Sequence, residues 1–115
     1  MLRPVSFIDT SVVCNILPIP DRDQDRERVL DEMRAKQKRE VLILPVTAVI
    51  ETGNFIAHLP GGNVRRTVAR KFSDMLELVI EGRACILTER EVYMSRTGLK
   101  SVAIWTIDNS LAGYS

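Results

Sequence analysis

The stretch that decides the fold is Val5-Ser6-Phe7-Ile8-Asp9-Thr10-Ser11, an apolar run that ends in one acid and two hydroxyls. Its first four residues predict a short buried strand, and Asp9 falls at the carboxyl end of that strand. In parallel α/β sheets, ligands bind beyond the carboxyl ends of the strands. A strand that ends in Asp is also typical of a turn or cap. The same arrangement recurs at 102–108, where an apolar run ends in Asp108, and this repetition favours a functional site.

Length and composition predict a single globular domain over residues 1–115. A chain of 115 residues suits one core, and 45% of its residues are hydrophobic. The formal net charge of +1 gives no global attraction to nucleic acid, so that any such binding needs a local patch. No apolar run approaches the length of a membrane span, and no signal-peptide pattern opens the chain. We therefore expect a cytoplasmic protein without a membrane partner.

Short apolar runs alternate with helical patterns along the chain. The predicted strands are 5–8, 41–44, 84–87 and 102–105. The predicted helical segments are a turn at 12–17, a charged helix over 21–40, a helix capped by Thr47, a long helix from Asn63 to Gly82, and a helix over 89–96 capped by Thr88. Such alternation is typical of parallel strands joined by right-handed crossovers. We predict an α/β fold, a small three-layer α/β/α sandwich with a central parallel sheet of about four strands; a flat two-layer α+β fold is the alternative.

Charged residues at two further positions in the chain could belong to a functional site. Glu51 lies in the first turns of the helix after the second strand, close to the carboxyl end of that strand; taken alone, this position favours a glutamate that compensates the helix dipole. The long helix carries basic residues mostly off its apolar stripe, and these either bind phosphates or form a solvated face. They are Arg65, Arg66, Arg70 and Lys71.

Several other chemistries are not favoured. His58 is the only histidine and has no nucleophile signature near it. The Gly61-Gly62 loop lacks the Lys and Ser/Thr of a phosphate-binding loop. Cys14 and Cys85 have no metal-ligand spacing, so we expect buried thiols of a reducing compartment rather than a disulfide or a zinc site.

Three segments of the chain resemble the PIN-domain nucleases, a family that includes the toxins of many bacterial and archaeal toxin–antitoxin pairs. The segments are Phe-Ile-Asp-Thr-Ser at 7–11, Leu-Pro-Val-Thr-Ala-Val-Ile-Glu at 44–51, and Trp-Thr-Ile-Asp-Asn-Ser-Leu at 105–111. They span nearly the whole chain and keep the order that the family has. The resemblance implies a single PIN-like domain with the activity of a metal-dependent endoribonuclease that cleaves RNA phosphodiester bonds.

The resemblance also implies roles for individual residues. Asp9, Glu51 and Asp108 would form an acidic cluster that holds Mg²⁺ or Mn²⁺. Thr10 or Ser11, together with Thr106, would supply hydroxyls that orient carboxylates or water. These hard cations prefer oxygen ligands, and carboxylates gathered at strand ends repel one another without a cation. Such an ion can activate a water and stabilise the charge that grows on a phosphate.

The chain departs from the family pattern at one place. The family usually has another acid after a Gly-Leu turn, whereas Gly98-Leu99-Lys100-Ser101 leads directly into the last predicted strand. Glu89 or Glu91 could replace that acid, although Glu91 fits a capping box better. The alternative hypothesis is therefore a catalytically impaired PIN-like scaffold that binds RNA or a protein partner. Expected partners are RNA, an antitoxin protein and a second copy in a homodimer, since the shortened segment could leave one sheet face thinly covered.

Overall fold

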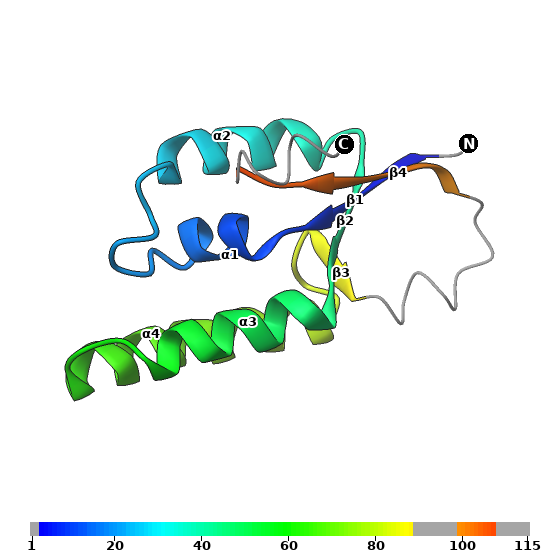
Figure 1. Cartoon of the computed structure of the whole chain (residues 1–115). Coiled ribbons are helices and arrows are strands. Elements are labelled where there is room, and N and C mark those ends of the chain that lie inside the picture. Colours follow the sequence, from blue (N-terminus) through cyan, green and yellow to red (C-terminus); the bar gives the residue numbers. More distant parts are fainter. Residues whose placement is uncertain (1–2, 89–98, 108–115) are drawn as a thin grey trace.

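The computed structural model describes residues 3–88 and 99–107. Within these residues, four strands and four helices follow one another (Figure 1). Their bounds are β1 Arg3–Ile8, α1 Thr10–Ile16, α2 Arg26–Lys36, β2 Val41–Leu44, α3 Val46–Ala57, α4 Gly62–Ile80, β3 Ile86–Thr88 and β4 Leu99–Trp105. The predicted helix at 89–96 and the residues after 107 lie outside the described residues.

The strands form one parallel sheet in the order β3-β2-β1-β4. This confirms the predicted α/β sandwich with a four-stranded parallel sheet. β1 lies in the interior of the sheet, where Val5 pairs with Val41 of β2 and with Val102 of β4. At its carboxyl end, Ile8 pairs with Trp105. The first and last described strands are therefore neighbours, and the residues that follow them meet at one edge of the sheet.

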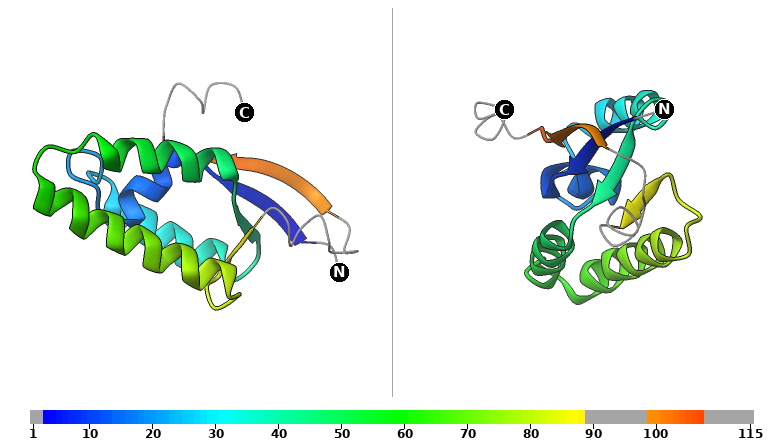
Figure 2. Two further views of the ribbon diagram at one scale, coloured as in Figure 1. Left: turned by 90° about the horizontal axis from the view of Figure 1, so that it is seen from below. Right: turned by 90° about the vertical axis from the view of Figure 1, so that its right-hand side faces the viewer.

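The main core lies between the helices and one face of the sheet. Because side chains alternate along a strand, one face of each strand supplies the core residues. The sheet contributes Ile8, Leu42, Leu44, Ile86 and Trp105, and the helices contribute, among others, Val12, Val29, Val68, Phe72 and Val79. α3 and α4 lie side by side in both views, and α4 also contacts β3 (Figure 2). This packing fixes α1 and α3, the helices that carry the candidate site, relative to the strand ends.

The helix starts differ from the predictions. α3 begins at Val46 with Pro45 as its N-cap, so Thr47 lies inside the helix and does not cap it. α4 begins at Gly62 after Gly61, whose φ of 88° requires glycine, so Asn63 is not the cap either. The α4 C-terminus agrees with the prediction, because Gly82 follows it with a φ of 71°.

Other boundaries also shift. α2 begins at Arg26 and not near Asp21, and β3 begins two residues and ends one residue later than predicted. β4 begins at Leu99, so Leu99 and Lys100 belong to the strand and not to a turn. Of the two thiols, Cys14 is buried as predicted, whereas Cys85 is exposed because it precedes β3 at the surface. No helix within the described residues is long and apolar enough to cross a membrane.

Candidate functional site

Asp9 occupies the point where β1 ends and α1 begins. Its backbone is extended, with φ −77° and ψ 157°, and its side chain caps α1 by accepting a hydrogen bond of 3.3 Å from the N–H of Ser11. The Ser11 hydroxyl donates to the same carboxylate oxygen, Oδ2, at 2.8 Å. The Thr106 hydroxyl donates to it at 3.0 Å. The cap interpretation of Asp9 is therefore correct, but the carboxylate also receives two hydroxyl donors that a cap does not need.

The end of β4 is tied to the start of α1 through these hydroxyls. The N–H of Asp9 donates to the carbonyl of Trp105 at 2.9 Å, which extends the β1–β4 ladder by one bond. The N–H of Ile107 donates to Ser11 Oγ at 3.3 Å, and the hydroxyl oxygens of Ser11 and Thr106 lie 3.2 Å apart. Three predicted site residues, Asp9, Ser11 and Thr106, are thus brought into one network.

Glu51 reaches the site from α3. Thr10, which is buried at the start of α1, donates its hydroxyl to Glu51 Oε2 at 2.7 Å. The Glu51 side chain is otherwise exposed to solvent. The hydrogen bond therefore fixes the direction of a carboxylate that would move freely on an isolated helix surface.

Asp9 and Glu51 line one pocket of about 410 Å³. Thr10, Ser11, Cys14, Asn15, Asp21, Arg22, Gln24, Phe55 and Ile107 complete its lining. Each carboxylate accepts its hydrogen bonds from described residues through one oxygen only, Oδ2 of Asp9 and Oε2 of Glu51. Within the described part of the chain, Oδ1 and Oε1 have no such partner. Such oxygens suit a hard cation, a water or a protonated ligand group.

Asp108, the third predicted ligand, lies outside the described residues. Within residues 3–88 and 99–107, no group of three His, Cys, Asp or Glu side chains could hold a metal ion. The donors in the pocket are carboxylates and hydroxyls, the ligand chemistry that Mg²⁺ and Mn²⁺ prefer. The described residues therefore offer part of a hard-cation site, because two of the three carboxylates that line this pocket, Asp9 and Glu51, are oriented by hydroxyl donors.

Cys14 lies in the same pocket but does not suit catalysis or metal binding. Burial raises the pKa of its thiol to about 11. The positive charge of Arg22 opposes this effect, while the negative charges of Asp9 and Glu51 add to it. At neutral pH the group is a protonated thiol, which is neither a nucleophile nor a good ligand.

Sequence reasoning missed three features of this pocket. One is the Thr10–Glu51 hydrogen bond, which joins two helices. The others are Arg22 and Phe55, whose side chains stack with the guanidinium carbon 3.7 Å from the ring centroid. Arg22 follows a segment rich in proline and Asp, and nothing in that segment distinguishes it from a solvated loop arginine.

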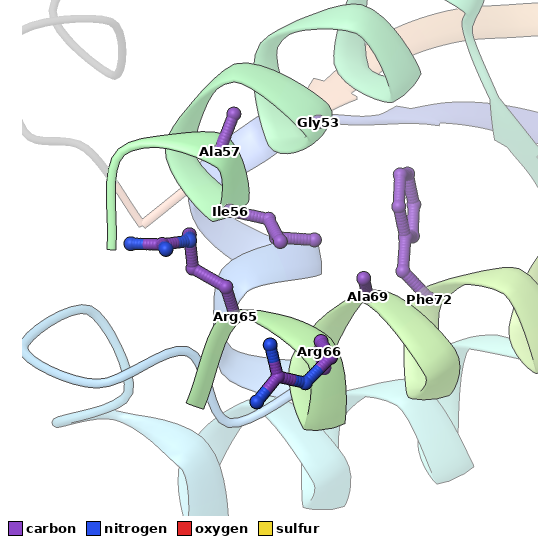
Figure 3. Close-up of a pocket in the computed structure, with 7 residues that line it drawn as sticks. All are labelled: Gly53, Ile56, Ala57, Arg65, Arg66, Ala69 and Phe72. Atoms are coloured by element: carbon purple, nitrogen blue, oxygen red, sulfur yellow. The ribbon is translucent and has the colours of Figure 1, made fainter. Parts of the chain in front are cut away.

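A second pocket, between α3 and α4, has a different character (Figure 3). It encloses about 360 Å³, and its described lining is apolar apart from Arg65 and Arg66. Figure 3 shows Ile56 and Phe72 extending into the space between the two helices. All four basic residues singled out on α4 are exposed. Among the described residues that line this pocket there is no carboxylate.

Comparisons with known proteins add no information about this site. No family model, no curated protein and no solved structure matches the chain.

Proposed function

We propose that the protein is a metal-dependent endoribonuclease that cleaves RNA phosphodiester bonds at the pocket between α1 and α3. The observation that carries the proposal is the way in which the two carboxylates are hydrogen-bonded. Asp9 and Glu51 are each fixed by hydroxyl donors on one oxygen, and the other oxygen has no described partner. The resemblance of segments 7–11, 44–51 and 105–111 to PIN-domain nucleases supports the same activity.

Asp9, Glu51 and Asp108 would hold Mg²⁺ or Mn²⁺. When bound, the ion supplies Lewis-acid stabilisation of phosphate charge and a more acidic water. Ser11 and Thr106 act on the protein side, because their hydroxyls fix Asp9 Oδ2 and so direct Oδ1. Thr10 does the same for Glu51. Such supporting hydrogen bonds are typical of metal-ligating carboxylates.

The test compares the wild type with Asp9→Asn. Asn caps helices as well as Asp does, so the variant keeps the cap of α1 and the fold. We expect calorimetric titration with MnCl₂ to show binding by the wild type and little or none by Asp9→Asn. Cleavage of a labelled single-stranded RNA should fall at least about 100-fold, in line with the loss of a principal charge-stabilising group. Thermal unfolding monitored by circular dichroism is the control for folding. Unchanged Mn²⁺ binding and cleavage in the variant would refute the proposal.

A second candidate function is a catalytically impaired scaffold that binds RNA or a protein partner. Two observations favour it: no three metal-ligating side chains gather within the described residues, and no acid follows the Gly98-Leu99 pair closely. It predicts RNA binding without metal-dependent turnover. Mn²⁺-stimulated cleavage by the pure protein would exclude it.

The resemblance also supports proposals about the partners of the protein and about its location in the cell. The protein would be the toxin of a toxin–antitoxin pair in the cytoplasm, neutralised by an antitoxin protein. A homodimer is supported by exposed apolar side chains, since Val46 and Ile50 on α3 are 59% and 58% exposed. Ile50→Asp should then shift the sedimentation coefficient from dimer to monomer, whereas a wild-type monomer would remove the dimer from the proposal.

A further inference from the structure

We propose that Arg22, held on the ring of Phe55, binds a backbone phosphate of the RNA adjacent to the one that is cleaved. This inference rests on the proposed function, which supplies RNA as the substrate class. It adds Arg22 as a residue that positions this substrate. Arg22 and Phe55 line the same pocket as Asp9 and Glu51. Arg22 is the only basic residue among the described residues that line it.

The stack leaves the guanidinium available to a ligand. Its carbon lies over the Phe55 ring, 3.7 Å from the ring centroid. The N–H groups of a guanidinium lie in its plane and form a fork that matches two phosphate oxygens. Within the described residues, Arg22 forms no ion pair. The residue therefore presents an oriented positive charge without a carboxylate of its own.

The backbone that carries Arg22 is firmly anchored to α1. Its N–H donates to the carbonyl of Ile19 at 3.0 Å, and the Ile19 side chain is fully buried. Asn15, 1% exposed, accepts from the N–H of Asp25 through Oδ1 and donates to the carbonyl of Ser11 through Nδ2. The loop between α1 and α2 is thus connected to the residue that orients Asp9. A rigid support of this kind lowers the entropy lost when the side chain binds a ligand.

Asp21, just before Arg22, supports a functional role for this arrangement. Its φ of 67° is in the left-handed region, which residues other than glycine rarely adopt. The chain turns at this residue, directly before the arginine that lies over the Phe55 ring.

Electrostatics supplies the reason why an RNA ligand needs Arg22. Asp9, Asp21 and Glu51 make the described lining negative, which repels a polyanion. A bound divalent cation offsets this charge at the carboxylates. Arg22 supplies a positive charge in the same lining, where it can bind a neighbouring phosphate. If Arg22 only balanced the charge of the carboxylates, its side chain would not need to be held on the Phe55 ring.

The test measures RNA binding separately from cleavage. A short fluorescein-labelled single-stranded RNA is titrated with wild type, Arg22→Gln and Arg22→Lys, in EDTA and in MnCl₂, over a range of salt concentrations. Arg34→Gln is the matched control, because Arg34 is an exposed arginine on α2 whose only described ion pair, to Asp31, is also exposed. Calorimetry with MnCl₂ alone and thermal unfolding are recorded for each protein.

We expect Arg22→Gln to weaken RNA binding about 10-fold and to lower the slope of log K against log salt by about 0.7, the value for one phosphate contact on a single strand. KM should rise by a similar factor while kcat changes little. Arg22→Lys should restore the salt slope and only part of the affinity, because an ammonium keeps the charge but not the planar stack. Phe55→Leu should weaken binding about 2- to 5-fold, the size of an exposed cation–π contact. Arg34→Gln should match the wild type.

The outcomes separate this inference from the proposed function. Cleavage by the wild type together with an unchanged KM and salt slope in Arg22→Gln overturns the inference and leaves the nuclease proposal intact. RNA binding that depends on Arg22 without any cleavage overturns the nuclease proposal and supports only the phosphate contact of Arg22, not its place beside a cleaved phosphate. A wild type that neither binds nor cleaves RNA overturns both. Tighter Mn²⁺ binding by Arg22→Gln with an unchanged salt slope would show that Arg22 only balances the charge of the carboxylates.

Discussion

Thr10 Oγ1 donates a hydrogen bond of 2.7 Å to Glu51 Oε2, although the two residues lie 41 positions apart in the chain. The contact joins the first turn of α1 to α3, and the Glu51 carboxylate lines the same pocket as Asp9. Thr10 is buried and Glu51 is exposed. The buried partner therefore determines where the exposed one points.

Thr10→Val tests this relationship, because valine keeps the shape of threonine and removes the hydroxyl. We expect the free energy of unfolding to fall by about 1 kcal/mol, the net value of one such hydrogen bond. The Kd for Mn²⁺ should rise about 10- to 100-fold, as is typical when a residue that orients a metal ligand is lost. Denaturant unfolding and MnCl₂ calorimetry measure the two effects.

Thr47→Val is the matched control, since Thr47 lies exposed on α3. It should leave both quantities close to those of the wild type. A Thr10→Val protein with lower stability but unchanged Mn²⁺ affinity would show that the hydrogen bond supports only the helix packing.

The two cysteines should differ sharply in reactivity. Burial raises the pKa of Cys14 to about 11, so at pH 8 its thiolate is scarce as well as inaccessible. Cys85 is exposed and should react with a thiol-specific disulfide reagent. We expect one rapid equivalent from the native wild type, none from Cys85→Ser, and two from the wild type in denaturant. Two rapid equivalents from the native protein would contradict the buried position of Cys14.

A buried polar contact on β1 makes stability depend on pH. Ser6, 2% exposed, donates to Glu40 Oε1 at 2.6 Å. Burial alone would raise the pKa of Glu40, but the hydrogen bond from Ser6 and the charge of Lys36 outweigh it and lower the pKa below the ordinary value of 4.5. The contribution of Glu40 is therefore fully present above pH 4.5 and is lost as the pH falls through the lowered pKa.

Ser6→Ala should lower the free energy of unfolding at pH 7 by about 1 kcal/mol, and this deficit should shrink at pH 3. Ser73→Ala, at an exposed position of α4, is the control and should change little at either pH. Denaturant unfolding at the two pH values gives the comparison. A deficit that stays constant with pH would mean that the Ser6 hydroxyl acts independently of the Glu40 charge.

Much of the fold could be predicted because buried strands are short apolar runs. Val41–Leu44 is predicted to the residue, and the order of strands and helices follows from the alternation along the chain. Helix starts were harder, since they depend on which backbone group a neighbouring segment satisfies. α2, for example, begins at Arg26, whose guanidinium donates to the carbonyls of Asn15 and Ile16 at the end of α1. No local pattern reveals such a contact.

Part of the candidate site could likewise be predicted from the sequence. Asp9, Ser11 and Thr106 follow neighbouring strands, so their meeting is a consequence of parallel topology. Glu51 was ambiguous in sequence because its partner, Thr10, lies on another helix. Arg22 had no signal at all, since its role depends on a ring supplied by α3. Tertiary contacts between side chains decide these cases, and periodicity carries no information about them.

The pairing of β1 with β4 has a consequence for the order of synthesis. A ribosome adds Thr106 97 residues after Asp9, so a growing chain exposes its first carboxylate long before the hydroxyl that orients it exists. The adjacent strand cannot pair until residues 99–107 have emerged, and contacts at such a separation form late in folding. The acidic pocket is therefore completed last, and a nascent chain that stalls before β4 carries Asp9 without its complete set of donors.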